Sequence, residues 1–216
     1  MLSYRPIINL IGMTHQSRPS SDVAFSPTVK VVQAERGSRA AYARVERGGG
    51  FETAVDERLA GFLAEIDTAF LATASADGQP YVQHRGGPRG FIRALDERTL
   101  GFLDLAGNRQ YVSTGNLRDN ERVCLLLMDY ARRRRIKVWG TARAVPATPE
   151  LVAALALPGS RARVEQVVLL TVSAWDVNCP QHIPQKLDAG EVAGVVDALR
   201  ARIAELEAEN QRLRSP

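Results

Sequence analysis

Cysteine, lysine and long apolar runs are all scarce in this chain. Cysteine occurs only as Cys124 and Cys179, too few for the disulfide framework of a small secreted protein. No apolar run approaches the roughly 20 residues that a membrane-spanning helix needs, and the first residues do not have the pattern of a signal peptide. The sequence therefore excludes transmembrane proteins and disulfide scaffolds, and we expect a cytoplasmic protein without a membrane partner.

The scarcity of lysine means that nearly all of the 28 basic residues are arginine. The formal net charge of +4 is compatible with nucleic-acid binding. However, the basic residues alternate with acidic ones and do not gather on one aromatic-bearing stripe. The one dense cluster, Arg132 to Arg135, falls where a hairpin turn is expected. We therefore predict a solvated turn there and no nucleic-acid partner.

The chain of 216 residues is long enough for one domain with appendages, and its content of 45% hydrophobic and 24% charged residues is ordinary for a globular protein. We divide it into four segments. Residues 1–25 are expected to be disordered or to reflect a mis-called start, with Met13 as the alternative first residue. Residues 26–67 form N-terminal helices, residues 68–185 a β domain, and residues 188–214 a C-terminal helix.

Helix signals are clear in the N-terminal segment. Ser26 followed by Pro27 predicts a helix that begins at the proline and runs to about Arg36. Residues 38–44 continue with one or two further helical turns, and three glycines follow. A capping-box-like start at residues 53–56 then predicts a helix with its apolar residues on one face.

The middle of the chain reads as a series of strands. The predicted strands are residues 69–75, 79–86, 90–95, 99–105, 122–129, 135–146 and 165–175. Residues 77–78 and 96–98 have the composition of hairpin turns, and a short helix is predicted from Thr148 to about Leu157. Strands joined mainly by hairpins predict a mainly β fold, an antiparallel closed sheet with peripheral helices.

The C-terminal segment has a heptad pattern. Leucine or valine recurs every seven residues at Val192, Leu199, Leu206 and Leu213, while Val196, Ile203 and Asn210 fill the alternate positions. β-Branched residues and an asparagine at position a, with leucine at d, favour a parallel two-stranded coiled coil. The alternative is a helix packed back onto its own β domain.

The ordered motifs between Ala69 and Gly140 are the most specific feature of the sequence. They are the first strand, the segment Gln83-His84-Arg85-Gly86-Gly87, the strand that ends at Leu105, and the turn Gly107-Asn108-Arg109-Gln110. Together they resemble the pyridoxamine-phosphate-oxidase-like family of FMN-binding split barrels, and most closely its bacterial branch of predicted flavin-nucleotide-binding proteins. The resemblance spans about residues 50–185. It implies an FMN-binding antiparallel split barrel and a homodimer with FMN at the subunit interface.

The phosphate of FMN needs guanidinium groups, backbone N–H groups or a helix N-terminus. Asn108 is expected to cap a helix that runs towards Asn120, and Arg109 to project from its first turn, with Gln110 in the same segment. An arginine beside the positive end of a helix is electrostatically unfavourable unless an anion lies there. Arg109 is therefore the leading phosphate ligand, the alternative being a surface arginine.

By the same resemblance, Gln83, His84 and Arg85 lie along the flavin, and Gly86 lets the backbone approach the ligand without a Cβ atom. The alternative for Arg85 is an ion pair with an acid such as Asp104, and the alternative for His84 is a structural role. Asp104 and Thr114 are further cofactor-binding candidates, although Asp104 could instead hold an arginine in place.

Two basic residues of a later strand, Arg135 and Lys137, alternate with apolar neighbours. Residues at this point in the family reach the flavin across the dimer interface, so both are cofactor-binding candidates by resemblance. The alternative is that they form the outward polar side of a half-exposed strand.

A polar run between the last strand and the C-terminal helix contains Cys179 and His182, and it resembles the tail segment of the same bacterial branch. No second pair of ligands accompanies them, so no metal site is predicted. Cys–His catalysis would lack an orienting partner. His84, His182 and Cys179 are the candidate catalytic residues, and the alternative for the run is a proline-braced connector.

The expected function is that of an FMN-dependent oxidoreductase acting on an unidentified small molecule. The alternatives are a non-catalytic flavin carrier or redox-responsive binding module, and a split barrel that binds heme or deazaflavin. The Arg- and His-bearing C-terminal segment that closes the substrate site of true pyridoxamine phosphate oxidases is not found here. The resemblance therefore implies the flavin without implying a vitamin B6 substrate.

Overall fold

The computed structural model describes residues 18–156 and 163–214. The predictions for residues 1–17 and for a helix end at Leu157 lie outside these ranges. The chain divides between Phe51 and Glu52 into two compact units. The helix α3, which we grouped with the N-terminal helices, belongs to the second unit.

The first unit contains a short 3-10 helix, η1 (Ser20–Val23), and the helices α1 (Pro27–Glu35) and α2 (Arg39–Arg47). The prediction of disorder was therefore wrong for the residues of η1. As the sequence predicted, Ser26 caps α1 by accepting a hydrogen bond from the N–H of Val29, and the proline stands in the first turn. Phe25 packs edge-on against the rings of Tyr42 and Phe51, which joins the two helices.

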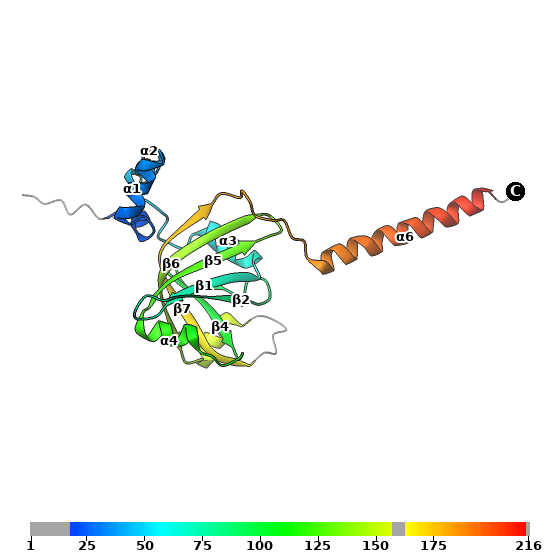
Figure 1. Cartoon of the computed structure of the whole chain (residues 1–216). Helices are drawn as coiled ribbons and strands as arrows, with labels where there is room; N and C mark the ends of the chain where they lie inside the picture. The colour runs from blue at the N-terminus through cyan, green and yellow to red at the C-terminus, as the bar shows by residue number, and fades with distance from the viewer. Residues whose placement is uncertain (1–17, 157–162, 215–216) are drawn as a thin grey trace, which may run out of the picture. The chain divides into compact units, whose positions relative to one another are not determined.

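The second unit is built on seven antiparallel strands (Figure 1). Its elements in chain order are α3 (Glu57–Glu65), β1 (Thr68–Ala74), β2 (Pro80–Gly86), β3 (Arg93–Ala94), β4 (Thr99–Leu105), α4 (Val112–Asp119), β5 (Arg122–Asp129), β6 (Arg134–Val145), α5 (Pro149–Leu155), β7 (Val164–Asn178) and α6 (Ala189–Arg214). The mainly β, antiparallel fold with peripheral helices is confirmed.

The strands lie in the order β2-β1-β5-β6-β7-β4-β3. The order leaves β2 and β3 as edges, so in the described chain backbone hydrogen bonds do not close the sheet into a full barrel. The prediction of a closed sheet was wrong in this respect. The strand predicted at residues 90–95 is reduced to the two residues of β3, because residues 87–92 turn to bring Phe91 and Ile92 into the core.

One apolar core holds α3 against the sheet. Leu59, Phe62 and Leu63 of α3 are buried with the inward residues of the strands. Asp56 caps this helix by accepting from the N–H of Leu59 at 3.0 Å, so the helix begins later than the capping-box-like segment at residues 53–56 suggested. Trp175 of β7 is almost fully buried and donates to the carbonyl of Ala54 at 2.7 Å, which fastens the start of the unit to β7.

The long strand β6 can pass β7 closely only because of a glycine. The register between them shifts at Trp139/Gly140. A Cβ atom at Gly140 would stand 2.0 Å from the backbone oxygen of Thr171, well inside any allowed contact. β6 pairs with β7 on both sides of this irregularity, from Arg135 to Val145, and the missing Cβ atom lets the two backbones stay close where the register shifts.

Arg132 and Arg133 lie in the turn between β5 and β6, as predicted, whereas Arg134 and Arg135 already belong to β6. Asp129, which is buried, accepts a hydrogen bond from the backbone N–H of Arg132 at 2.9 Å and an ion-pair contact from Arg134 at 3.0 Å. Burial alone would raise the pKa of Asp129, but these donors outweigh it and hold the pKa below its ordinary value. The cluster therefore braces a turn.

The C-terminal helix α6 is present as predicted. None of its residues is buried. Packing of this helix onto its own β domain, the alternative considered for the sequence, is therefore not observed. In the described parts of the chain, no helix combines the length and the apolar character that a membrane span requires.

We expect Asp129→Asn to lower the free energy of unfolding at pH 7 by roughly 1 to 2 kcal/mol, since its arginine partners are half-exposed and solvent screens them. A carboxyl whose pKa is lowered by folding stabilises the protein above its ordinary pKa of about 4 and loses that contribution as pH falls through the folded-state pKa. Urea unfolding of both proteins should thus converge at acid pH. Asp119→Asn, at an exposed position, is the control, and an equal effect there would contradict the role of Asp129.

Candidate functional site

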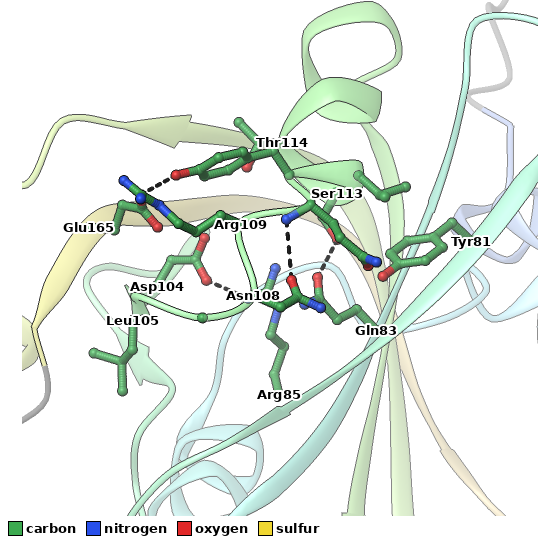
Figure 2. Close-up of a pocket in the computed structure, with 14 residues that line it drawn as sticks. Tyr81, Gln83, Arg85, Asp104, Leu105, Asn108, Arg109, Ser113, Thr114 and Glu165 are labelled. Atoms are coloured by element: carbon green, nitrogen blue, oxygen red, sulfur yellow. Dashed lines mark hydrogen bonds and ion pairs between the residues drawn. The ribbon is translucent and has the colours of Figure 1, made fainter.

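A polar cavity of about 260 Å³ lies where the edge strand β2, the end of β4 and the start of α4 meet. Figure 2 shows its lining residues. They are Tyr81, Gln83 and Arg85 of β2, Asp104 and Leu105 of β4, residues 107–111 of the following turn, Val112, Ser113 and Thr114 of α4, and Glu165 of β7. Seven of the predicted cofactor-binding residues meet here, namely Gln83, Arg85, Asp104, Asn108, Arg109, Gln110 and Thr114.

The two-residue period of β2 decides which of its side chains reach the cavity. Tyr81, Gln83 and Arg85 are half-buried on the inner face, while Val82 and His84 are exposed on the other. His84 packs instead against the ring of Phe70, with 5.5 Å between centroids. The structure therefore separates His84 from the two neighbours with which the sequence grouped it.

An ion pair crosses the open edge of the sheet inside the cavity. The guanidinium of Arg85 on β2 donates from Nη1 to Oδ1 of Asp104 on β4, and both side chains are 13% exposed. The other carboxylate oxygen accepts from Nε2 of Gln166 at 2.8 Å, and the same amide nitrogen lies 2.8 Å from Oγ1 of Thr114. The ion-pair alternative for Arg85 is thus what the structure shows, and Asp104 holds this arginine in place.

The turn before α4 differs from the prediction. α4 begins at Val112, four residues after Asn108, so Asn108 is not its cap. The side chain of Asn108 accepts a hydrogen bond from the N–H of Gln110 at 3.2 Å and closes a local turn. Arg109 and Tyr111 have φ angles of 62° and 54°. These left-handed conformations are incompatible with a helix at these positions, and Arg109 therefore lies before the first turn of α4.

The start of α4 is held at the cavity by polar contacts with two strands. Ser113 is buried and donates to Oε1 of Gln83 at 2.7 Å, and Asn116 donates to the hydroxyl of Thr73 on β1 at 3.0 Å. No side chain caps the N-terminus of α4. The N–H groups of its first turn therefore remain available to an acceptor, and the cavity is at the positive end of the helix.

Each of the two arginines in the cavity has an acid nearby. Arg109, at the exposed rim, has a raised pKa. The main cause is a hydrogen bond with the side chain of Tyr111, and the negative charge of Glu165 adds to it. The hydroxyl of Tyr111 in turn donates to Glu165. With Arg85 beside Asp104, the formal charges of the cavity sum to zero. An anion in this cavity would therefore be held by directed hydrogen-bond donors and not by net charge.

Four other predicted residues lie away from the cavity. Gly86 lines a small apolar cavity of about 30 Å³ with Phe91, Leu103 and Leu155, and a Cβ atom at Gly86 would stand 2.8 Å from the side chain of His84. Cys179 and His182 are exposed in the segment after β7. Lys186 of this segment donates from its N–H to the carbonyl of Tyr130, and Gln185 to that of Ala131. These contacts hold the segment after β7 against the turn between β5 and β6, as expected for a connector. His84, on the outer face, is the fourth.

Arg135 and Lys137 lie on the outer face of β6, because Ile136 and Val138 between them are buried in the core. Opposite them on β7 are Asn178 and Asp176. Burial raises the pKa of Asp176, an effect that the N–H of Val177 and the charge of Lys137 oppose. Nε of Arg135 and Oδ1 of Asn178 are both buried without a hydrogen-bond partner in the described structure.

Sequence reasoning missed several lining residues, among them Tyr81, Tyr111, Ser113 and Glu165. Alternation from Gln83 and Arg85 would have found Tyr81. Ser113 could have been predicted, because it is a small polar residue directly before Thr114, which was among the candidates. No local sequence pattern pointed to Glu165, because the pairing of β7 with β4 brings it to Tyr111 from more than fifty residues away along the chain. Among the described residues, no group of histidine, cysteine and acidic side chains could hold a metal ion.

A double-mutant cycle on Arg85→Ala and Asp104→Ala should give a coupling energy of about 2 kcal/mol in urea unfolding, because either single change leaves a largely buried charge unpaired. The exposed pair of Arg58 and Glu52, with atoms 2.8 Å apart and side chains 64% and 57% exposed, is the matched control. It should show no measurable coupling. Equal coupling in both pairs would refute the structural role of the Arg85–Asp104 contact.

Three solved structures illustrate what the chain is similar to. A putative pyridoxamine 5'-phosphate oxidase from Lactobacillus delbrueckii is 21% identical, with 58% of this chain and 95% of that chain covered and a TM-score of 0.45. An FMN-binding protein from Syntrophomonas wolfei is 8% identical, with 68% and 97% covered and a TM-score of 0.45. The heme storage protein HutZ from Vibrio cholerae is 16% identical, with 57% and 94% covered and a TM-score of 0.42.

No curated protein matches the sequence. The family model described as pyridoxamine 5'-phosphate oxidase matches residues 55–179, a range that includes the whole of the cavity. Since this match covers more than half of the 216 residues, the chain belongs to the pyridoxamine 5'-phosphate oxidase-like family.

Proposed function

We propose that this protein binds FMN, with the phosphate in the cavity between β2, β4 and α4, and that it does so as a homodimer with FMN at the subunit interface. The observation that carries the proposal is the uncapped N-terminus of α4 beside Arg109 in that cavity. Backbone N–H groups at a helix N-terminus and a guanidinium group are the donors that a phosphate dianion requires.

The donor set suits a phosphate even though the cavity carries no net charge. A guanidinium has five N–H donors, and Arg85 uses Nη1 for Asp104 while its buried Nε has no partner in the described structure. Arg109 lies at the exposed rim, where a ligand can reach it from solvent. The hydroxyl of Thr114 and the amide of Gln83 are positioned for the polar chain that links phosphate and ring.

The size of the cavity supports a site completed by a second chain. A volume of about 260 Å³ is below the range of about 300–1,000 Å³ that is usual for whole ligands of this size. The phosphate and part of the sugar chain fit within it, and the flavin ring extends past the rim. A flat ring needs two walls, and the second wall in this proposal belongs to the partner subunit.

The outer face of the sheet offers a surface for that partner. Val82 is 60% exposed, and Phe70, Leu126 and Trp139 are half-exposed on neighbouring strands of the same face. Apolar side chains in such number on an outward face are typical of an interface. The buried, unpartnered atoms of Arg135 and Asn178 lie on this face too, and by resemblance Arg135 and Lys137 reach the flavin of the other subunit. The proposed dimer also pairs its two α6 helices as a coiled coil.

The reaction we propose is a flavin-dependent oxidation or reduction of a small molecule. Bound FMN supplies transfer of a hydride or an electron pair. The protein side chains contribute binding and orientation, and the hydroxyl groups of Tyr81, Tyr111 and Ser113 are the proton-bearing groups at hand. Neither His84, His182 nor Cys179 lines the cavity. That observation favours a second candidate, a flavin carrier without catalysis. It does not bear on heme, because tyrosine is also an axial ligand of heme iron and Tyr81 and Tyr111 line the cavity.

Replacing Arg109 with alanine should weaken FMN binding roughly 10- to 100-fold, the range for loss of one charge-assisted contact to a phosphate. Flavin fluorescence titration measures the affinity. Arg118→Ala removes an arginine from the exposed last turn of the same helix and serves as the control. Unchanged affinity in Arg109→Ala, or an equal loss in the control, would remove Arg109 from the site.

Catalysis and carriage differ in how the loaded protein treats acceptors. For an oxidoreductase, photoreduced holoprotein should be reoxidised by at least one member of a panel of quinones and oxidised nicotinamides faster than free reduced FMN is under the same conditions. Stopped-flow absorbance of the flavin band follows the reaction. Rates equal to those of free FMN across the panel would instead identify a carrier. A purified protein with a heme spectrum would overturn the flavin assignment.

A further inference from the structure

The helix α6 leaves an apolar stripe uncovered along its whole length. Its 26 residues include none that is buried. Leu199, Ile203 and Leu206 are 59%, 55% and 47% exposed although they succeed one another at intervals of four and three residues on one face. A soluble helix normally covers such a stripe. The question is what covers it.

We infer that α6 pairs in parallel and in register with α6 of a second copy of this chain. Positions a of the heptad are Val196, Ile203 and Asn210, and positions d are Val192, Leu199, Leu206 and Leu213. β-Branched residues at a with leucine at d favour two parallel strands over three or four. An asparagine at a single a position fixes both the register and the number of helices, since it is satisfied only by the same asparagine opposite.

The charges beside the stripe are complementary to themselves. Arg202 at position g faces Glu207 of the partner subunit at position e, and Glu209 faces the partner subunit's Arg214. Each contact occurs twice in a symmetric pair, as an interface between identical chains requires. Within its own helix Arg202 contacts Glu205 at 2.9 Å, with both side chains about two-thirds exposed, so it remains free to share its donors. This self-complementarity identifies a second copy as the occupant, in preference to a foreign helix.

The pairing has a consequence for the cofactor site, and this step rests on the proposed function. About three heptads are marginal as an isolated helix pair. Joined to two β domains, however, the pair holds both halves of an interfacial site at a high effective concentration. The paired helices would thereby strengthen a dimer to which the β domains also contribute.

Cysteine cross-linking in the full-length chain tests the orientation. In a Cys179→Ser background, Leu199→Cys places two thiols opposite each other only if the helices are parallel and in register. Mild oxidation should convert most of this variant to a covalent dimer. Ala201→Cys, at the outward position f of the same turn, is the matched control and should stay monomeric on a denaturing gel. Absence of the cross-link in Leu199→Cys, or equal cross-linking in both variants, would overturn the inference.

Charge reversal tests the partner contacts. Arg202→Glu should weaken the dimer roughly fivefold in sedimentation equilibrium, since two attractive pairs become repulsive. Adding Glu207→Arg should restore it. Arg200→Glu is the matched control, because Arg200 contacts only Asp197 of its own helix, at 3.5 Å, and faces Val195 across the pair. Equal weakening by both single reversals, or no rescue, would contradict the inference.

The same protein samples show which of the two proposals fails, the pairing of α6 or the binding of FMN. If Leu199→Cys cross-links while the protein takes up no FMN in a fluorescence titration, the paired helix stands and the proposed function fails. If FMN binds and the cross-link does not form, the helix pairing alone is wrong. Asn210→Leu should still dimerise but admit larger assemblies in sedimentation velocity, and an unchanged distribution would remove Asn210 from the seam.

Discussion

The contact between Arg85 and Asp104 is the constraint on which the site depends. The two residues belong to strands that are not neighbours in the sheet, β2 at one edge and β4 close to the other. Gln166 extends the contact to β7 and Thr114 extends it to α4. Four elements are thus joined at one point by side chains, in the place where backbone hydrogen bonds cannot close the barrel. The cavity lies beside this cluster of hydrogen-bonded side chains.

This arrangement would let a cavity without net charge hold the phosphate of the proposed cofactor. Asp104 pairs with Nη1 of Arg85, while the buried Nε atom of that arginine has no hydrogen-bond partner in the described structure. The uncapped first turn of α4 adds N–H groups that Ser113 and Asn116 hold rigidly in position. Donors fixed in advance bind without the entropic cost of ordering them. In the proposed function, selectivity for the phosphate would come from the placement of these donors.

Much of this fold was predictable from the spacing of apolar residues and from the residue types at turns and helix caps. The cap at Ser26, the hairpins and the heptads of α6 are local signals, and all correspond to observed elements. The start of α4 was not predictable, because the left-handed residues Arg109 and Tyr111 postpone the helix beyond Asn108. His84 was misplaced because its motif was taken as a unit, although alternation along β2 assigns adjacent residues to opposite faces. Glu165 depends on strand pairing, which no local pattern contains.

The cavity and the C-terminal helix α6 differ in what each needs in order to be complete. The cavity needs residues from four elements, so it exists only once the sheet has formed, and its volume of about 260 Å³ is smaller than the proposed flavin nucleotide would need. The helix α6 buries no residue against its own chain, and in our inference its exposed stripe and its charges select an identical partner. A site completed by a second subunit gains most when the second subunit is already tethered. The paired helix is therefore the element that would make an incomplete cavity sufficient.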